Sequence, residues 1–363
     1  QRGDDAGARV ALEDALLNDP TSPWIRLDLA RLYMKMGAYN DARGVMDGLL
    51  VSNPDLPEAQ YASALLATEM QDWRGALNTL DNIPAQSRTR DMATLQKRAW
   101  VHVQAADAAE LARQGRAQEA IALLAQAEPQ AGQDPELLGA IALGYTDAGD
   151  TGRALNMMRQ LLSRTTRPDI GLRLQYAAIL LRTRQDVELA GILRQLQSET
   201  MNPTQRKSYE DIRVAYIVRQ ADGLRTSGDL VMAYDTLAPL LAERPDDPQV
   251  VGALARMYAD ARDYQQALGL YNQLLEKDPR NLETMLAAAS MATSAKEYGY
   301  AENVLDNALR QAPQNPEVLT AAGRLYRAQG KSSKAEQYFA AAVQAENRQR
   351  GIAPAYAANG RPG

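Results

Sequence analysis

Few side chains of this sequence have the type and spacing that catalysis or metal binding requires. The chain contains one histidine, His102, and no cysteine. A single imidazole cannot assemble a metal cluster, and no acidic residue lies three or four positions from His102. The acidic pairs Asp4-Asp5 and Asp246-Asp247 lie beside turns, where helix capping explains them. We therefore expect no catalytic residue, no metal ion and no cofactor.

A Gly-Lys-Ser sequence near the C-terminal end, Gly330-Lys331-Ser332, is similar to the end of a phosphate-binding loop. The earlier glycine of that motif would fall at Leu325, inside a helical pattern and without a preceding strand. Gly330 is better explained as a turn glycine. We expect no nucleotide site and a protein that is not an enzyme.

Aromatic side chains are the remaining candidates, because their faces can stack on sugar rings. Four tyrosines recur where paired helices need an aromatic residue between them: Tyr33, Tyr145, Tyr258 and Tyr326. The aromatic residues without such a structural role are Trp24, Tyr61, Trp100, Tyr209, Tyr216 and Tyr300. Only this second group is available to explain a ligand.

The charge pattern excludes another class of ligand. The formal net charge is −5, with 40 basic and 45 acidic residues interleaved along the chain. A nucleic-acid-binding surface would need a basic stripe, so we expect no nucleic acid partner. No apolar run reaches the roughly 18–20 residues that cross a bilayer.

The elements that carry these residues are paired helices, and residues 248–281 show the pairing most clearly. Apolar and small residues recur there at intervals of three and four, as on one face of a helix. They form two stripes: Val251, Leu254, Ala255 and Tyr258, then Ala267, Leu270, Tyr271, Leu274 and Leu275. The chain turns near Asp263, and Pro279 cannot continue the second helix. The segment is therefore predicted to be a helical hairpin.

This hairpin repeats along the chain. A small residue of the second helix recurs every 34 residues, at Ala8, Ala42 and Ala76 and again at Ala233, Ala267, Ala301 and Ala335. A helix–turn–helix unit of this length resembles the tetratricopeptide repeat, in which the small residue lets the two helices approach closely. The resemblance implies an all-α, right-handed solenoid whose core is shared between neighbouring repeats.

The period fails twice. Ala120 follows Ala76 by 44 residues, and Ala233 follows Ala190 by 43, whereas Ala190 follows Ala154 by 36. Both long intervals are helical in composition. We expect extra helices at 90–114 and 204–226, each fused to or kinked against the first helix of the next repeat. Residues 84–91 and 198–204 are the predicted hinges.

These breaks divide the chain into predicted arms. The first arm is 1–89, beginning inside a repeat; the second is 90–202, and the third and most regular is 203–350. Residues 351–363 are a predicted Gly/Pro linker to a C-terminal region that the sequence lacks.

In the tetratricopeptide family, ligands usually lie against the concave surface that the first helices form. Placing the repeat frame on this sequence assigns seven candidate residues to that surface: Trp24, Arg31, Lys35, Tyr61, Arg256, Arg324 and Arg327. The Lys/Asn set with which chaperone-binding members hold a peptide carboxylate is missing here. Solvated face residues are the alternative explanation for the arginines.

The C-terminal part of the chain is similar to a particular family. Residues 322–342 (AGRLYRAQGKSSKAEQYFAAA), 347–351 (NRQRG) and 356–363 (YAANGRPG), together with the long inserted helices, resemble the C component of bacterial cellulose synthase. The resemblance implies a periplasmic repeat scaffold that precedes an outer-membrane exit barrel in the same full-length chain, anchoring it in the outer membrane. The implied partners are the other subunits of cellulose synthase, with the glucan chain or peptidoglycan as further contacts.

A second interpretation stays open at this point. The chain could be a protein- or peptide-binding tetratricopeptide adaptor, either in the cytoplasm or in the assembly of another exopolysaccharide system. Absence of cysteine is compatible with both compartments.

Overall fold

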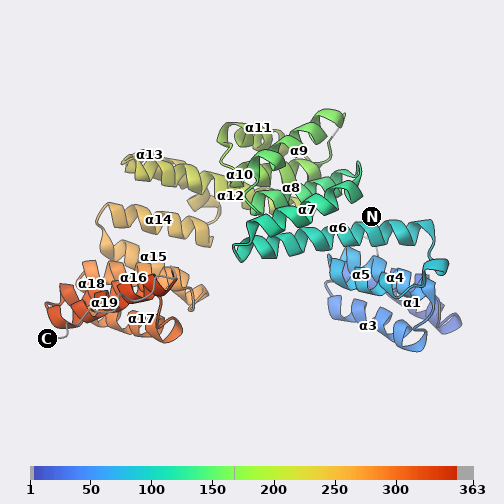
Figure 1. Ribbon diagram of the computed structural model, residues 1–363, viewed down its shortest axis with the longest axis horizontal. Helices are drawn as coiled ribbons and strands as arrows, with labels where there is room; N and C mark the ends of the chain where they lie inside the picture. The colour runs from blue at the N-terminus through green and yellow to red at the C-terminus, as the bar shows by residue number, and fades with distance from the viewer. Residues whose placement is uncertain (1–3, 167, 350–363) are drawn as a thin grey trace, which may run out of the picture. The chain divides into compact units, whose positions relative to one another are not determined.

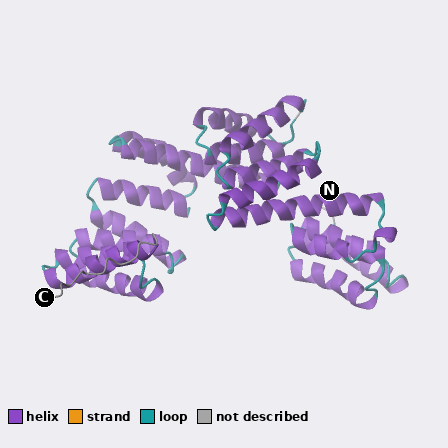
Figure 2. Ribbon diagram, in the orientation of Figure 1, coloured by secondary structure: helices purple, strands orange, loops and turns teal. Residues whose placement is uncertain are grey.

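The computed structural model describes residues 4–166 and 168–349, and every regular element in these ranges is helical (Figure 2). One short 3-10 turn, Ala85–Ser87, accompanies the α-helices. The expectation of an all-α repeat protein is thus confirmed. The helices are α1 (Asp5–Asn18), α2 (Pro23–Lys35), α3 (Tyr39–Ser52), α4 (Pro57–Glu69), α5 (Trp73–Asp81), α6 (Arg90–Arg113), α7 (Ala117–Ala131), α8 (Pro135–Asp147), α9 (Thr151–Arg164), α10 (Ile170–Arg182), α11 (Asp186–Gln197), α12 (Pro203–Thr226), α13 (Leu230–Glu243), α14 (Pro248–Asp260), α15 (Tyr264–Lys277), α16 (Leu282–Ser294), α17 (Tyr298–Gln311), α18 (Pro316–Ala328) and α19 (Ser332–Gln349).

From α2 onward the even-numbered helices are the first helices of the repeats and the odd-numbered helices are the second. Several first helices begin with proline behind a polar cap, a combination that suits a helix N-terminus. In α14, for example, Asp247 accepts a hydrogen bond from the Gln249 amide at 2.9 Å, and Pro248 takes the first helical position. Local sequence therefore fixes where these helices begin.

Every turn from a first to a second helix places one residue in the left-handed backbone region. Glycine supplies it at Gly37, Gly115, Gly149, Gly228 and Gly330. The other four turns use Gln71, Arg184, Arg262 and Lys296, with φ between 57° and 64°. Residues with a side chain adopt this region only at a cost, so the repeat geometry holds them there.

The small-residue position of the second helices is the fifth residue counted from the cap. Ala42, Ala76, Ala120, Ala154, Ala233, Ala267 and Ala301 occupy it and are fully buried. In α11 the prediction of Ala190 is wrong. Gln185 is the cap, so Leu189 takes this position and is fully buried, while Ala190 is only half-buried. The sequence pattern favoured alanine, but the turn geometry sets the register.

Each predicted insertion is part of one continuous helix, so the structure shows the fused alternative and no separate extra helix. α6 and α12 each have 24 residues, and Figure 1 shows α6 unbroken. The added N-terminal part of α6 packs on α5, where Met92 and Ala99 join Ala76 and Leu80 in one buried cluster. The remaining part pairs with α7 and α8.

The described residues form two compact units that divide between Tyr209 and Glu210, within α12. Each unit has its own buried clusters, built mainly from alanine and leucine. None of the described helices is both long and apolar enough to serve as a membrane span. The predicted linker 351–363 lies outside the described residues, and the division into three arms stays a prediction.

Candidate binding surface on the first helices

All seven predicted residues lie on first helices, but they form separate groups. Trp24, Arg31 and Lys35 are on α2 and Tyr61 is on α4. The other three lie in the second unit: Arg256 on α14, and Arg324 and Arg327 on α18. We call the exposed sides of these helices the first-helix surface.

The two aromatic candidates of the first unit meet. The rings of Trp24 and Tyr61 contact edge to face, with centroids 6.1 Å apart and planes at 79°. Trp24 is 44% exposed, whereas Tyr61 is half-buried. Burial, with a smaller effect of the Asp91 charge, raises the pKa of Tyr61. The pair presents an aromatic surface that bridges two repeats.

Arg31 and Lys35 are neutralised by carboxylates. Arg31 Nη2 donates to Glu69 Oε1 at 2.6 Å and Arg31 Nε donates to Glu69 Oε2 at 3.1 Å. Hydrogen bonding to Glu69 raises the pKa of Arg31 even though burial opposes the shift. Lys35 Nζ lies 2.5 Å from Asp5 Oδ1. These cations therefore join neighbouring helices, a role that residue type and spacing did not indicate.

Arg256 is engaged in the same way in the second unit. It donates to both Asp222 oxygens, at 3.0 and 2.6 Å, and Arg225 Nε donates to Asp222 at 3.0 Å. Arg225 also pairs with Asp260, which completes a four-residue network between α12 and α14. Burial alone would raise the pKa of Asp222, but the bonds from Arg256 and Arg225 outweigh it and lower the pKa below its usual range.

Arg324 differs from its repeat equivalents Arg31 and Arg256. All three lie eight residues after the start of a first helix. Within residues 4–166 and 168–349, however, no carboxylate lies within ion-pairing distance of Arg324 or of Arg327. The Arg327 guanidinium lies 5.4 Å from the ring centroid of Phe339, a cation–π distance. Both arginines are exposed. The guanidinium groups of Arg324 and Arg327 therefore lack a carboxylate partner in the described residues and can pair with an anionic ligand.

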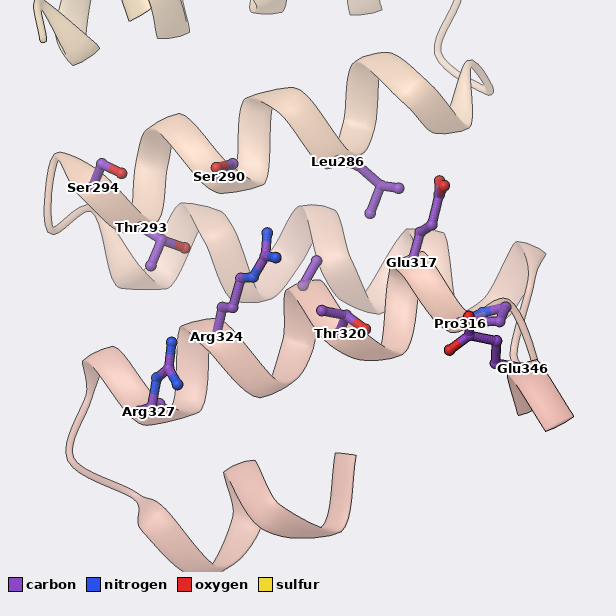
Figure 3. A pocket seen from close by; sticks show the side chains of 11 residues that line it. Leu286, Ser290, Thr293, Ser294, Pro316, Glu317, Thr320, Arg324, Arg327 and Glu346 are labelled. Carbon is purple, nitrogen blue, oxygen red and sulfur yellow. The ribbon is translucent and has the colours of Figure 1, made fainter. Parts of the chain in front are cut away.

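These arginines line a cleft of about 620 Å³ between α16 and α18 (Figure 3). Figure 3 shows their side chains on the side of α18 that faces α16, where Ser290, Thr293 and Ser294 lie. Glu317 and Glu346 line the other end. The cleft is therefore cationic and hydroxyl-rich at one end and anionic at the other, which suits a polar segment of complementary charge.

Sequence reasoning missed the hydroxyl residues and Glu346 of this cleft. The repeat frame makes Ser290 an equivalent of Arg324, but nothing in the sequence places it opposite that arginine. Glu346 lies on α19, and its position depends on the packing of that helix on α18. The repeat frame carries one usable signal, because Ser290 and Thr293 occupy the positions of Arg324 and Arg327 in the preceding repeat.

No group of three or more His, Cys, Asp or Glu side chains in the described residues is arranged to hold a metal ion. His102 contacts another aromatic ring instead. Its imidazole stacks on Trp73, with centroids 3.7 Å apart and planes at 10°. His102 Nε2 lies 3.4 Å from Glu136 Oε1, but the two atoms are not aligned as a hydrogen bond. His102 thus serves packing between α5, α6 and α8.

Known proteins resemble this chain in three comparisons: with family models, with curated proteins and with solved structures. Family models described as tetratricopeptide repeat match residues 1–67, 250–283 and 294–350. Among curated proteins, cellulose synthase operon protein C of Xanthomonas axonopodis pv. citri (strain 306) is 48% identical over 275 residues, covering 75% of this chain and 18% of the relative. The protein of the same name from Pseudomonas fluorescens (strain SBW25) is 41% identical over 279 residues, covering 77% and 22%.

The chain therefore spans about a fifth of the length of these relatives. Among solved structures, yeast Tom70 aligns over 95% of this chain and 76% of its own, with 14% identity and a TM-score of 0.42.

Proposed function

Because this chain is a tetratricopeptide repeat protein similar to a stretch of cellulose synthase operon protein C, we propose that it is a non-catalytic scaffold of bacterial cellulose synthesis. The observation that carries the proposal is the 48% identity over 75% of the chain to a protein of that name. The chain covers only part of that relative, so the role of the whole protein belongs to the proposal as well.

The structure supports a mechanical role. Neighbouring first helices are joined by ion pairs and shared buried clusters, so each repeat is held by the next one along the chain. Residues that could do chemistry are instead used for packing, as His102 shows. A repeat array of this kind can hold two partners at a set separation without reacting with either.

The proposal includes a place in the cell. We infer that the scaffold works in the periplasm, in a full-length protein anchored in the outer membrane by an exit barrel, and that it aligns the synthase with that exit. Its partners would be other members of the cellulose synthase complex. This part rests on the family resemblance of the sequence.

The experiment shortens the scaffold by one repeat in the full-length protein in cells. Deletion of residues 263–296 removes α15 and α16 and joins the turn residue Arg262 to the cap Glu297, so the repeat frame is preserved. A matched control replaces 263–296 with a second copy of 229–262, which keeps the length and changes the sequence. If length is what matters, the deletion lowers secreted cellulose, measured by dye binding, and the replacement does not.

The periplasmic placement of the scaffold can be tested in cells that produce the full-length protein. Because these 363 residues lack cysteine, a Ser332→Cys substitution adds one thiol at an exposed position, and the unsubstituted full-length protein is the labelling control. A maleimide that crosses only the outer membrane is expected to label it in intact cells. Labelling only after lysis would contradict the periplasmic placement, and normal cellulose from the deletion would contradict the spacer role.

A second candidate function is favoured by the cleft between α16 and α18. Its unpaired Arg324 and Arg327 suit an acidic segment of a partner protein, as in a peptide-binding adaptor. The length-preserving replacement distinguishes the two functions, because it removes the α16 wall of the cleft. Loss of cellulose from the deletion and the replacement alike would favour the adaptor.

A further inference from the structure

The N-terminal extension of α6 builds a second cleft, away from the seven candidate residues of the first-helix surface. One face of the extension packs on α5 through Met92 and Ala99. The neighbouring face carries residues spaced by three and four, which line a cleft of about 370 Å³ together with residues of α5 and α7. Its walls are Ala93, Gln96, Lys97 and Trp100 of α6, Leu77 and Asp81 of α5, and Gln130 of α7. A regular repeat would lack this extension, so the cleft is a product of the inserted residues.

The polar rim of the cleft is held in place before any ligand binds. Gln96 Nε2 donates to Asp81 Oδ1 at 2.5 Å, and Gln96 Oε1 accepts from Arg88 Nη1 at 3.0 Å. Arg88 is itself fixed, because its Nε donates to the Ile83 carbonyl at 2.8 Å. The amide and carboxylate therefore keep one orientation, which lowers the entropy that binding must overcome.

The chemistry of the cleft matches a neutral, polyhydroxylated ligand. Trp100 and Leu77 offer apolar surface to the C–H face of a sugar ring, and Asp81, Gln96 and Gln130 offer partners for hydroxyl groups. The formal charges of Asp81 and Lys97 cancel. Among the described residues, the Trp100 indole N–H has no hydrogen-bond partner and Lys97 forms no ion pair. Both donors thus remain available.

We propose that this cleft binds a β-linked glucan chain, stacked on Trp100. The choice of a glucan rests on the proposed role in cellulose synthesis, whereas the choice of a neutral sugar rests on the cleft. The other long helix gives an internal comparison. Trp100 lies thirteen residues before the end of α6, and the residue at the same place in α12 is Arg213. Arg213 forms ion pairs with Glu210 at 2.8 Å and with Glu243 at 2.6 Å. The sugar-binding features belong to α6.

The test is calorimetric titration of the 363-residue chain with cellohexaose, using maltohexaose as a control of equal size and different linkage. We expect cellohexaose to bind the wild-type chain and Trp100→Ala to weaken that binding about tenfold, the effect of losing one aromatic stacking partner. Tyr39→Ala removes an accessible aromatic ring outside both candidate surfaces and should leave the affinity unchanged. Gln130→Ala, at an exposed position without structural bonds in the described residues, should weaken it severalfold and covers the case that Trp100→Ala does not fold.

Three results would overturn the proposal: no binding of cellohexaose, equal binding of maltohexaose, or loss of binding in Tyr39→Ala in place of Trp100→Ala. These outcomes are separate from the failure of the scaffold function. If shortening the scaffold stops cellulose secretion while cellohexaose does not bind, the scaffold stands and the glucan site is wrong. If deletion of residues 263–296 leaves cellulose secretion unchanged, the spacer function is wrong whatever the titration gives.

Discussion

At the scale of single residues, the arginines of the first-helix surface show that an identical position can have different roles. Arg31, Arg256 and Arg324 share a place in the repeat, yet the first two face Glu69 and Asp222 and the third faces serines. A carboxylate one repeat away decides whether the guanidinium joins helices or stays free for a ligand. Exposure and residue type alone do not distinguish these cases.

Glu136 gives a prediction at this scale. Contacts with His102 and Arg98 hold the pKa of Glu136 at about 2, below the ordinary 4.5. A carboxylate with a lowered folded-state pKa stabilises the fold above its unfolded pKa, and the stabilisation is lost as the pH falls toward 2. Glu136→Gln should therefore lower the free energy of unfolding at pH 7, by at most about 1 kcal/mol because the pair is partly exposed, and this effect should shrink as the pH falls through 2.

The measurement is urea unfolding followed by circular dichroism at several pH values. Glu58→Gln is the matched control, because Glu58 also follows the first proline of a first helix and forms no ion pair in the described residues. A wild-type advantage over Glu136→Gln that is as large at pH 2 as at pH 7, or an equal effect of Glu58→Gln, would contradict the assignment.

At the scale of elements, helix register explains both the regular repeats and the exception at α11. The fourth residue after the cap faces the paired first helix, and a small residue there allows close packing in most repeats. In α11 the same position holds Leu189, which is equally buried. The pair α10 and α11 has thus adapted to a larger side chain.

Opposite substitutions at this position test the register. Ala267→Leu should destabilise α14–α15 by about 1–3 kcal/mol through overpacking. Leu189→Ala should destabilise α10–α11 by about 2–5 kcal/mol, because it leaves a cavity. Hydrogen exchange read by mass spectrometry locates each effect. Ala190→Gly should destabilise α10–α11 less than Leu189→Ala does. The reverse order would show that Ala190, as the sequence pattern predicted, is the residue that faces the paired helix.

At the scale of the whole molecule, the described residues bury several separate hydrophobic clusters along the chain. The two compact units, divided between Tyr209 and Glu210, each bury separate clusters. In such an array stability is a sum over repeats and their neighbours, so damage should stay local.

Truncating one buried leucine in each unit tests whether the loss of stability stays local. Leu80→Ala and Leu305→Ala each remove a side chain that is at most 2% exposed, and each should cost about 2–5 kcal/mol locally. We expect Leu80→Ala to reduce amide protection in α4, α5 and the start of α6, and Leu305→Ala to reduce it in α16 to α18. Equal loss of protection along the entire chain would show one cooperative unit and contradict the expectation.

The sequence by itself determined the helical class, the period and the helix that carries each candidate residue, including Arg324 on α18 and Trp24 on α2. These properties depend on apolar spacing and on caps and turns, which act within one repeat. It also predicted the long helices, although it left open whether they were fused or kinked.

Only the tertiary structure decided which side chains meet. The pairing of Arg31 with Glu69, the burial of Leu189, the open cleft at Arg324 and the second cleft at Trp100 all depend on residues from adjacent repeats. Such contacts depend on the angle and distance between packed helices, which the 34-residue period does not specify. For that reason Trp100 was visible in the sequence as an aromatic residue without a structural role, while the polar groups around it were not.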